Sequence, residues 1–269
     1  MKLGLLGTNI EHSLSPTIHN SALEAIGING SFTLLPTETN ELEERLVSSF
    51  QTGYQGLNVT APHKARVLSC VHSQSDLVTT INSANTLVRN EQGWHAESTD
   101  GEGVRYALTK WSNRLIPGYA VILGSGGFAR AVAFELLTTG WNVSIYSRRI
   151  LTTDWSGLIS LFSENLSFDG WDDRTHLPET VSLVVNATPL GIDGVSSPLP
   201  LEGEYHTGLF YLDAVYSPQR TPLLECLVKN SVSAQNGMRI LVGQAARSFQ
   251  LWTGIEFPEN IKQKLVVDE

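Results

Sequence analysis

The sequence predicts an α/β protein made of two domains. Segments that favour strands alternate with segments that favour helices along most of the chain, a pattern typical of parallel sheets covered by helices on both faces. A glycine-rich turn at 124–127 joins one such strand to the helix after it. At 269 residues the chain is also longer than one hydrophobic core usually supports, so we expect two cores.

The first hundred residues hold the elements of one sheet. Strands are expected at 3–6, 31–35 and 55–59, and helices at 16–26, 42–50, 64–70 and 76–81. The first helix has Pro16 at its first position, and Ser15 is expected to be its N-cap. Two short strands at 86–88 and 94–96 flank the turn-forming sequence Asn90-Glu91-Gln92-Gly93, which predicts a hairpin.

A second α/β unit begins after Pro117-Gly118. Strands are expected at 119–123, 143–146, 181–185 and 209–212, with helices at 127–139 and 239–252. Since the glycine-rich turn lies in the middle of the chain, we expect the two ends of the chain to pair into the other domain. The predicted domains are therefore 1–103 with 238–269, and 104–237.

The composition argues against several classes of function. The net charge is −9 and no run rich in lysine or arginine occurs, so nucleic acid is not an expected partner. No apolar run approaches the roughly 20 residues that cross a bilayer, so no membrane association is expected. Cys70 and Cys226 have no metal or redox spacing and are expected to be reduced, buried and inert in a cytoplasmic protein. The seven histidines cluster with no cysteine or carboxylate, so no metal site is expected.

The segment Asn58-Val59-Thr60-Ala61-Pro62-His63-Lys64 carries most of the chemistry. Its strand delivers Asn58 and Thr60, Pro62 ends the strand, and Lys64 opens the next helix. Strand ends that lead into helices are where open α/β sheets present side chains to ligands. A lysine held there can act as a fixed proton donor. On its own such a segment is more often a turn with a surface lysine, so the interpretation depends on the other motifs.

A glycine-rich loop, Gly124-Ser125-Gly126-Gly127-Phe128, follows an apolar strand and opens an amphipathic helix. Glycines let the backbone turn tightly and approach a pyrophosphate, and the helix N-terminus adds unpaired N–H groups. Many glycine-rich loops are simply turns, but the position between strand and helix in a βαβ unit favours a dinucleotide site.

The next strand predicts which dinucleotide is bound. It ends at Ser147-Arg148-Arg149, where NAD sites usually carry an acidic residue for the ribose 2′-hydroxyl. Guanidinium groups match a phosphate, so the two arginines favour a 2′-phosphate. We therefore expect NADP(H), with a solvated basic turn as the alternative.

A series of short motifs spans nearly the whole chain. They are Ser13-Leu14-Ser15-Pro16, Asn58 to Lys64, Ala84-Asn85-Thr86-Leu87, Ser98-Thr99-Asp100-Gly101, Gly124 to Gly127, Asn186-Ala187-Thr188-Pro189-Leu190-Gly191, Tyr216 before Pro218, Thr221-Pro222-Leu223-Leu224, and Gly237 to Gln244. No single motif is decisive, but their joint order is specific. Through it the chain resembles the shikimate dehydrogenase family.

The resemblance implies reversible, NADP(H)-dependent interconversion of 3-dehydroshikimate and shikimate in aromatic amino acid biosynthesis. It implies small-molecule substrates, a cytoplasmic location and a monomer or homodimer. The implied fold has two α/β domains around a cleft. An N-terminal substrate domain is completed by the C-terminal helices, and the other domain is a Rossmann-like NADP-binding domain.

Lys64 and Asp100 match the family's catalytic pair. Hydride transfer to a ketone produces an alkoxide, and Lys64 is expected to donate the proton that this oxygen needs. Asp100 is expected to hold the ammonium in place and to accept from a substrate hydroxyl.

Hydroxyl and amide side chains match the family's substrate-binding positions. The resemblance implies that Ser13, Ser15 and Tyr216 hold the substrate carboxylate, that Thr60, Asn85 and Gln244 bind ring hydroxyls, and that Asn58 belongs to the same set. Hydroxyls can donate to a carboxylate without placing an arginine near the hydride path. The alternatives are helix caps for the serines, a packed aromatic for Tyr216, backbone caps for Thr60 and Asn85, and an ordinary polar helix position for Gln244.

The resemblance also implies a cofactor-binding set. It comprises Gly124, Ser125, Gly126, Gly127 and Phe128 in the glycine loop, Ser147, Arg148 and Arg149 after the next strand, Asn186, Ala187 and Thr188 after a third strand, and Ala214 and Gly237 near the nicotinamide.

The chain departs from the family pattern in places. Ser98 and Ser147 stand where the family commonly has asparagine, and Arg149 where it commonly has threonine. Lys64, Asp100 and Gln244 are present, so we expect activity to be retained.

Three alternatives stay open on the sequence. A quinate/shikimate dehydrogenase of relaxed specificity is one, although quinate-accepting relatives often have threonine at the position of Ser15. A non-catalytic sensor of shikimate and NADP is the second, and the presence of both Lys64 and Asp100 argues against it. A folate-linked dehydrogenase of similar architecture is the third, and it would not need Ser13 and Ser15.

Overall fold

The structure is a computed structural model, and it describes residues 1–149 and 152–266. Among the described residues, the chain folds into two compact units, one formed by Met1–Asp100 and 242–266, the other by Gly101–Leu241. The predicted domains, 1–103 with 238–269 and 104–237, divide the chain by function, and that division stays a prediction.

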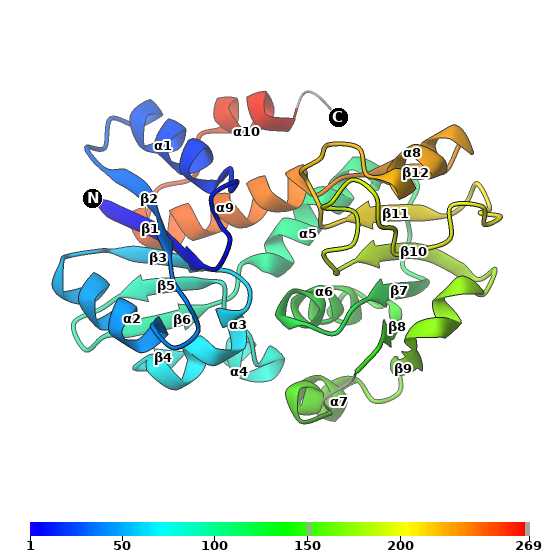
Figure 1. Cartoon of the computed structure of the whole chain (residues 1–269), viewed down its shortest axis with the longest axis horizontal. Helices are drawn as coiled ribbons and strands as arrows, with labels where there is room; N and C mark the ends of the chain where they lie inside the picture. Colours follow the sequence, from blue (N-terminus) through cyan, green and yellow to red (C-terminus); the bar gives the residue numbers. More distant parts are fainter. Residues whose placement is uncertain (150–151, 267–269) are drawn as a thin grey trace. The chain divides into compact units, whose positions relative to one another are not determined.

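The first unit is built on a mixed sheet. Its elements are β1 (Lys2–Gly7), α1 (Ser15–Ala25), β2 (Ser31–Pro36), α2 (Leu42–Gln51), β3 (Gly56–Val59), α3 (His63–Arg66), the 3-10 helix η1 (Val67–Cys70), β4 (Ser73–Gln74), α4 (Asp76–Ile81), β5 (Thr86–Arg89), β6 (Trp94–Glu97), α9 (Met238–Thr253) and α10 (Glu259–Val266). The strand order is β2-β1-β3-β5-β6-β4 (Figure 1). β1, β2 and β3 are parallel, whereas β5 pairs antiparallel with both β3 and β6.

Helices cover both faces of this sheet. On one face, Leu46 of α2 and Val78 of α4 pack with Leu57 and Leu87 of the strands. On the other face, α1 and α9 pack through aromatic rings, and Trp252 of α9 donates from Nε1 to the carbonyl of Leu87 over 2.9 Å. The carboxyl end of β3, where the candidate catalytic segment begins, is thereby fixed between two packed layers.

The second unit is built on a parallel sheet. Its elements are α5 (Asp100–Leu108), the 3-10 helix η2 (Thr109–Trp111), β7 (Tyr119–Leu123), α6 (Gly127–Thr138), β8 (Asn142–Ser147), η3 (Thr152–Trp155), α7 (Ser156–Phe162), β9 (Leu166–Gly170), η4 (Trp171–Thr175), β10 (Val181–Asn186), β11 (Phe210–Asp213), α8 (Pro222–Lys229) and β12 (Ser233–Gln235). The strand order is β12-β11-β10-β7-β8-β9, and every neighbouring pair is parallel (Figure 1).

This sheet is apolar on both faces, as expected when helices cover each side. Leu223 and Leu227 of α8 join a core with Val121, Val184 and Tyr211 of the central strands. Helix α6 packs on β7 and β8, and α7 packs on α6. The strand order reverses at β7. The chain adds β8 and β9 on one side of β7 and then returns to add β10 on the other side. Such a reversal is where ligands bind in open α/β sheets.

Most predicted elements are confirmed within a few residues, but three expectations are wrong. Ser15 is not the N-cap of α1, because the helix already begins at Ser15 and its backbone N–H donates to Oγ of Ser13 over 3.2 Å. The hairpin predicted at 86–88 and 94–96 is confirmed as β5–β6, but its antiparallel pairs mean that the first sheet is not parallel throughout. Cys70 and Cys226 are free, as expected, but both are partly exposed rather than buried.

Within the described residues, no helix combines the length and the apolar character that crossing a membrane requires.

Candidate active site

The structure brings Lys64 and Asp100 together. Nζ of Lys64 donates to Oδ2 of Asp100 over 2.5 Å, and the two side chains are 17% and 6% exposed. A charge-assisted hydrogen bond of this kind is roughly twice as strong as a neutral one. Because both groups are largely removed from water, each favours a defined orientation of the other. The predicted pair is therefore an ion pair of fixed geometry.

The backbone around Lys64 is held from two sides. The carbonyl of Lys64 accepts from the amide of Ala84 over 2.8 Å. Its neighbour His63 is fully buried, and Nε2 of His63 is hydrogen bonded to the carbonyl of Thr37 over 2.8 Å. Lys64 thus projects from a short helix, α3, that is anchored to loops on both sides, unlike a lysine on a free surface turn.

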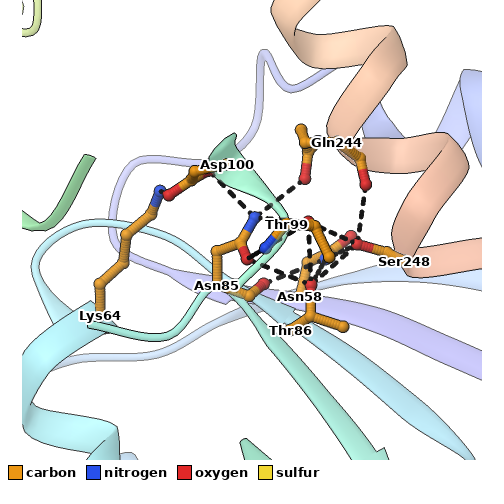
Figure 2. Close-up of polar contacts among 8 residues, drawn as sticks. All are labelled: Asn58, Lys64, Asn85, Thr86, Thr99, Asp100, Gln244 and Ser248. Carbon is orange, nitrogen blue, oxygen red and sulfur yellow. Dashed lines mark hydrogen bonds and ion pairs between the residues drawn. The ribbon is translucent and has the colours of Figure 1, made fainter. Parts of the chain in front are cut away.

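Asn85 connects this ion pair to helix α9. Figure 2 shows its side chain between Asp100 and Gln244. Nδ2 of Asn85 lies 3.0 Å from Oδ1 of Asp100 and 3.1 Å from Oε1 of Gln244, and donates to both. The Asn85 side chain is only 3% exposed, whereas Gln244 is partly exposed. Three of the predicted residues thus form a continuous chain of hydrogen bonds ending at Lys64.

A second layer of polar residues lies behind Asn85. Asn58 donates from Nδ2 to Oγ1 of Thr86 and to Oγ of Ser248, each over 3.1 Å, and to the backbone carbonyl of Asn85 over 3.1 Å. Thr99 joins the same cluster through Ser248 (Figure 2). These side chains are buried, and their hydroxyls and the Asn58 amide nitrogen are hydrogen bonded to one another instead of to water. The expected contact of Asn58 with a substrate stays a prediction.

Ser13 and Ser15 lie side by side at the start of α1. Their hydroxyl oxygens are 3.2 Å apart, with Ser13 donating to Ser15. Ser13 is partly exposed and Ser15 is 4% exposed. Thr60 follows β3 and is also partly exposed, with its backbone N–H donating to the carbonyl of Leu6. The serine pair presents two adjacent hydroxyls, an arrangement suited to one carboxylate.

The glycine loop lies in the second unit between β7 and α6. Gly124 has a φ of +106°, a conformation that side chains rarely adopt, and a Cβ there would lie 3.0 Å from Thr188. A Cβ on Gly126 would meet nothing within 4 Å, so there is open space beside the loop at this residue. The N-cap Gly126 has no side chain with which to cap the helix, a feature common at helix N-termini that bind anions.

The end of β8 adjoins this loop. Oγ of Ser125 lies 2.8 Å from Oγ of Ser147, and Ser125 also donates to the carbonyl of Arg149 over 2.8 Å. Arg148 and Arg149 are exposed. The glycine loop and the two arginines therefore belong to one local surface, as a site for a phosphorylated dinucleotide requires. Phe128 lies in the first turn of α6 and is partly exposed.

The remaining predicted cofactor residues follow β10 and β11. Asn186 is fully buried, and its Oδ1 accepts from the backbone N–H and the hydroxyl of Thr188 over 3.0 and 2.6 Å. Ala187 and Ala214 are partly exposed, and Tyr216 is partly exposed two residues beyond Ala214. Tyr216 belongs to the second unit, whereas Ser13 and Ser15 belong to the first, so their predicted convergence on one carboxylate stays a prediction.

Several site residues were missed by the sequence analysis. Thr86 and Thr99 directly neighbour Asn85 and Asp100 in the motifs at 84–87 and 98–101. Ser248 lies four residues after Gln244 and therefore on the same face of α9, a spacing that could have drawn attention to it.

No cluster of histidine, cysteine and carboxylate side chains suited to a metal ion occurs in the part of the chain that the structure describes.

A parallel sheet with a glycine loop at its reversal point, together with a partly buried lysine–aspartate pair, places this protein among the α/β dehydrogenases. Residues 5–87 match the family model of the shikimate dehydrogenase substrate binding domain, and residues 237–261 match that of the shikimate 5′-dehydrogenase C-terminal domain. The chain is 34% identical to the shikimate dehydrogenase (NADP(+)) of Leptospira interrogans, over 94% of this chain and 89% of that protein. It is 32% identical to the Methanopyrus kandleri protein of the same name, over 99% and 94%.

A solved structure agrees with these relatives. Shikimate 5-dehydrogenase from Thermus thermophilus, in complex with NADP(H) and shikimate, superposes with a TM-score of 0.85 at 30% identity, covering 100% of this chain and 99% of that one. This chain therefore belongs to the shikimate dehydrogenase family.

Proposed function

We propose that the protein catalyses the reversible, NADPH-dependent reduction of 3-dehydroshikimate to shikimate, a step of aromatic amino acid biosynthesis. The observation that carries the proposal is the Lys64–Asp100 ion pair, held in a hydrogen-bond chain by Asn85 and Gln244. The relatives at 30–34% identity are named as NADP(+)-dependent shikimate dehydrogenases, and the Thermus thermophilus structure holds both NADP(H) and shikimate.

Lys64 is the proposed proton donor. The bound cofactor supplies the hydride for the ketone carbon. The ammonium of Lys64 then provides the proton that the reduced oxygen needs, and it takes this proton back in the reverse direction. Asp100 fixes the ammonium through Oδ2. It also offers a carboxylate that can accept from a neighbouring substrate hydroxyl.

Neutral polar groups surround this pair, and we propose that they recognise the substrate. Asn85, Gln244 and Thr60 suit ring hydroxyls because amides and hydroxyls both donate and accept. Ser13, Ser15 and Tyr216 suit the carboxylate, to which their three hydroxyls can donate. With a net charge of −9 the protein repels anions at long range, so a carboxylate site must depend on such local donors.

The second unit fits a phosphorylated dinucleotide. The open space at Gly126 and the glycine N-cap of α6 suit a pyrophosphate. The exposed Arg148 and Arg149 suit a 2′-phosphate. Asn186, Ala187, Thr188, Ala214 and Gly237 are proposed to line the rest of the cofactor.

An assay of NADPH oxidation with 3-dehydroshikimate tests the proposal directly. The loss of NADPH absorbance measures the turnover. We expect turnover with this ketone, reverse turnover with shikimate and NADP+, and much weaker turnover with quinate. Comparable turnover with quinate would favour the enzyme of relaxed specificity. Binding of shikimate and NADP+ without any turnover would show a sensor and contradict the proposal.

We further propose a cytoplasmic location and a monomeric or homodimeric state. Two free cysteines and a need for NADPH suit the cytoplasm. Light scattering during size-exclusion chromatography distinguishes a monomer of 29.4 kDa from a dimer.

A further inference from the structure

Strand β11 ends on a carboxylate that is removed from water. The side chain of Asp213 is 0% exposed. Its partners among the described residues are hydrogen-bond donors, and none of them carries a positive charge. Burying a carboxylate is unfavourable unless its oxygens are well satisfied. Such a residue is therefore expected to serve a purpose beyond packing.

Four donors satisfy the two oxygens of Asp213. Oδ1 accepts from Nδ2 of Asn186 over 2.9 Å and from the backbone N–H of Val215 over 3.0 Å. Oδ2 accepts from the hydroxyls of Tyr211 over 3.0 Å and Thr221 over 3.1 Å. Burial raises the pKa of Asp213, and these hydrogen bonds oppose that shift. The donors come from β10, from β11 and from two different segments after β11.

The Asn186 donor ties Asp213 to the loop after β10. Besides accepting from Thr188, Asn186 donates from Nδ2 to the carbonyl of Leu190 over 3.1 Å. The hydroxyl of Thr188 in turn accepts from the backbone N–H of Leu190 over 3.2 Å. The conformation of the proposed cofactor segment Asn186-Ala187-Thr188 thus depends on an amide whose direction Asp213 sets.

The Val215 donor ties Asp213 to the segment that leads to Tyr216. The N–H of Ala214 donates to the carbonyl of Asn186 over 3.0 Å, and the carbonyl of Val215 accepts from the N–H of Gly237 over 3.0 Å. A Cβ on Gly237 would lie 2.3 Å from the carbonyl oxygen of Ala214, so only glycine allows this approach. The proposed nicotinamide neighbours Ala214 and Gly237 are therefore locked against each other beside Asp213.

The Thr221 donor explains a motif that no proposed contact with substrate or cofactor uses. Thr221 is fully buried and is the N-cap of α8, where its Oγ1 accepts from the N–H of Leu224 over 3.4 Å. The same hydroxyl donates to Asp213. The motif Thr221-Pro222-Leu223-Leu224 thereby fixes where the chain returns to the sheet after Tyr216.

We propose that Asp213 is a positioning residue, which through these hydrogen bonds sets the Asn186–Thr188 and Ala214–Tyr216 segments for the nicotinamide and the substrate carboxylate. This inference rests on the proposed function of both segments. Because its side chain is 0% exposed, Asp213 acts through its donors and not by contact with a ligand. What it supplies is acceptor geometry, and not negative charge at the reacting atoms.

Two substitutions at Asp213 separate geometry from charge. In Asp213→Asn the amide oxygen can still accept from Asn186 and Val215, while the hydroxyls of Tyr211 and Thr221 can rotate to accept from the new N–H group. We expect kcat/KM for shikimate and the Kd for NADP+ to stay close to wild type. Asp213→Ala leaves four buried donors unpaired, and we expect kcat/KM to fall by about 10²-fold, the scale of an ångström-sized misplacement, with a weaker Kd for NADP+.

Asp193→Ala is the matched control. Asp193 also holds a loop of the second unit by accepting from backbone N–H groups, of Val195 and Ser196, but it is exposed. We expect its kinetics to be unchanged. Wild-type kinetics in folded Asp213→Ala would overturn the proposal. An Asn variant as impaired as the Ala variant would also overturn it, because charge and not geometry would then be required.

A second pair of variants tests the proposal if Asp213→Ala is not properly folded, which a loss of cooperative unfolding would show. Thr221→Ser keeps the hydroxyl and Thr221→Val removes it at nearly constant volume. We expect Ser to retain kcat/KM and Val to lose about tenfold, the scale of one buried hydrogen bond to a charged group. Equal kinetics in both would overturn the proposal. If the wild type shows no turnover, the proposed function fails instead, and the NADP+ Kd values of these variants still test the positioning.

Discussion

The side-chain amide of Asn85 donates to Oδ1 of Asp100 over 3.0 Å, while Lys64 occupies the other carboxylate oxygen. The backbone N–H of Thr99 donates to Oδ1 of Asn85 over 2.7 Å, so the amide cannot flip without losing its bond to Asp100. Thr99 directly precedes Asp100, and one short segment therefore carries the carboxylate and orients its partner. This arrangement gives Asp100 a preset direction, which its proposed role of holding a proton donor requires.

Lys64→Ala should abolish most of the turnover. Because the variant lacks the proposed proton donor, we expect kcat to fall by about 10²-fold or more, the usual scale for positioned acid catalysis. The Kd for NADP+ should change little, since Lys64 lies in the other unit from the glycine loop. Steady-state kinetics and a binding titration measure both quantities. Lys262→Ala, which removes a lysine paired with Glu259 at 3.4 Å on α10, is the control. A folded Lys64→Ala variant with wild-type kcat would refute the assignment.

Tyr216→Phe and Ser15→Ala test the proposed carboxylate site. Each variant removes one hydroxyl donor, and we expect the KM for shikimate to rise by an amount equivalent to roughly 0.5–1.5 kcal/mol, or more if the carboxylate is left unpaired. The Kd for NADP+ should stay the same in Ser15→Ala. Tyr205→Phe, which removes a hydroxyl bonded to the carbonyl of Pro200, is the control and should leave KM unchanged. An unaltered KM in both test variants would rule out the site.

The sequence predicted the nucleotide-type unit closely, and the reason is local. β7 and α6 are an apolar run and an amphipathic segment joined by glycines, so pattern and turn chemistry agree there. Helix α10 was missed because none of its residues is buried and its pattern is therefore weak. Helix α8 was missed, although Thr221 and Pro222 are an N-cap and a first-turn proline that indicate a helix start.

The sequence predicted the side chains that cluster around Lys64, but not the layer of polar residues behind them. Lys64, Asp100, Asn85 and Gln244 were named from motifs, and the structure joins them in one chain of hydrogen bonds. The layer behind them, with Ser248, depends on contacts between residues as far apart as 58 and 248. Sequence spacing carries no information about such long-range pairing, and each of these residues alone resembles an ordinary polar position.

His19 should make the free energy of unfolding depend on pH. The ring is fully buried, stacks on Phe32 at 4.4 Å and lies 5.2 Å from Trp252. Burial lowers the pKa of His19 to about 3, while the neighbouring Asn58 side chain acts in the opposite sense. Between about pH 6.5 and 3 the unfolded chain then binds a proton that the folded chain does not bind. The contribution of His19 to the free energy of unfolding is therefore fully present above pH 6.5. Below pH 6.5 it decreases, by up to about 1.4 kcal/mol per pH unit.

Urea unfolding of His19→Leu at several pH values measures this contribution. Between about pH 6.5 and 5, the free energy of unfolding should decrease less in the variant than in the wild type, whatever the absolute stability of the variant. His72→Gln, at an exposed position of the same unit, should keep the wild-type decline. An identical pH dependence in wild type and His19→Leu would show that His19 is protonated in the folded state.

Replacing Arg148 and Arg149 together by alanine should change the cofactor preference. Both side chains are exposed beside the glycine loop, and a charge-assisted bond to a 2′-phosphate is worth roughly 1.5–3 kcal/mol. We therefore expect NADP+ binding to weaken by about ten- to a hundred-fold for one such bond, while NAD+ binding hardly changes. The two effects need not add, since both arginines can share one phosphate. Titrations of both cofactors, with exposed Arg114→Ala as the control, measure this. Equal losses for both cofactors would indicate a folding defect, and no loss for either would leave the arginines as a solvated basic turn.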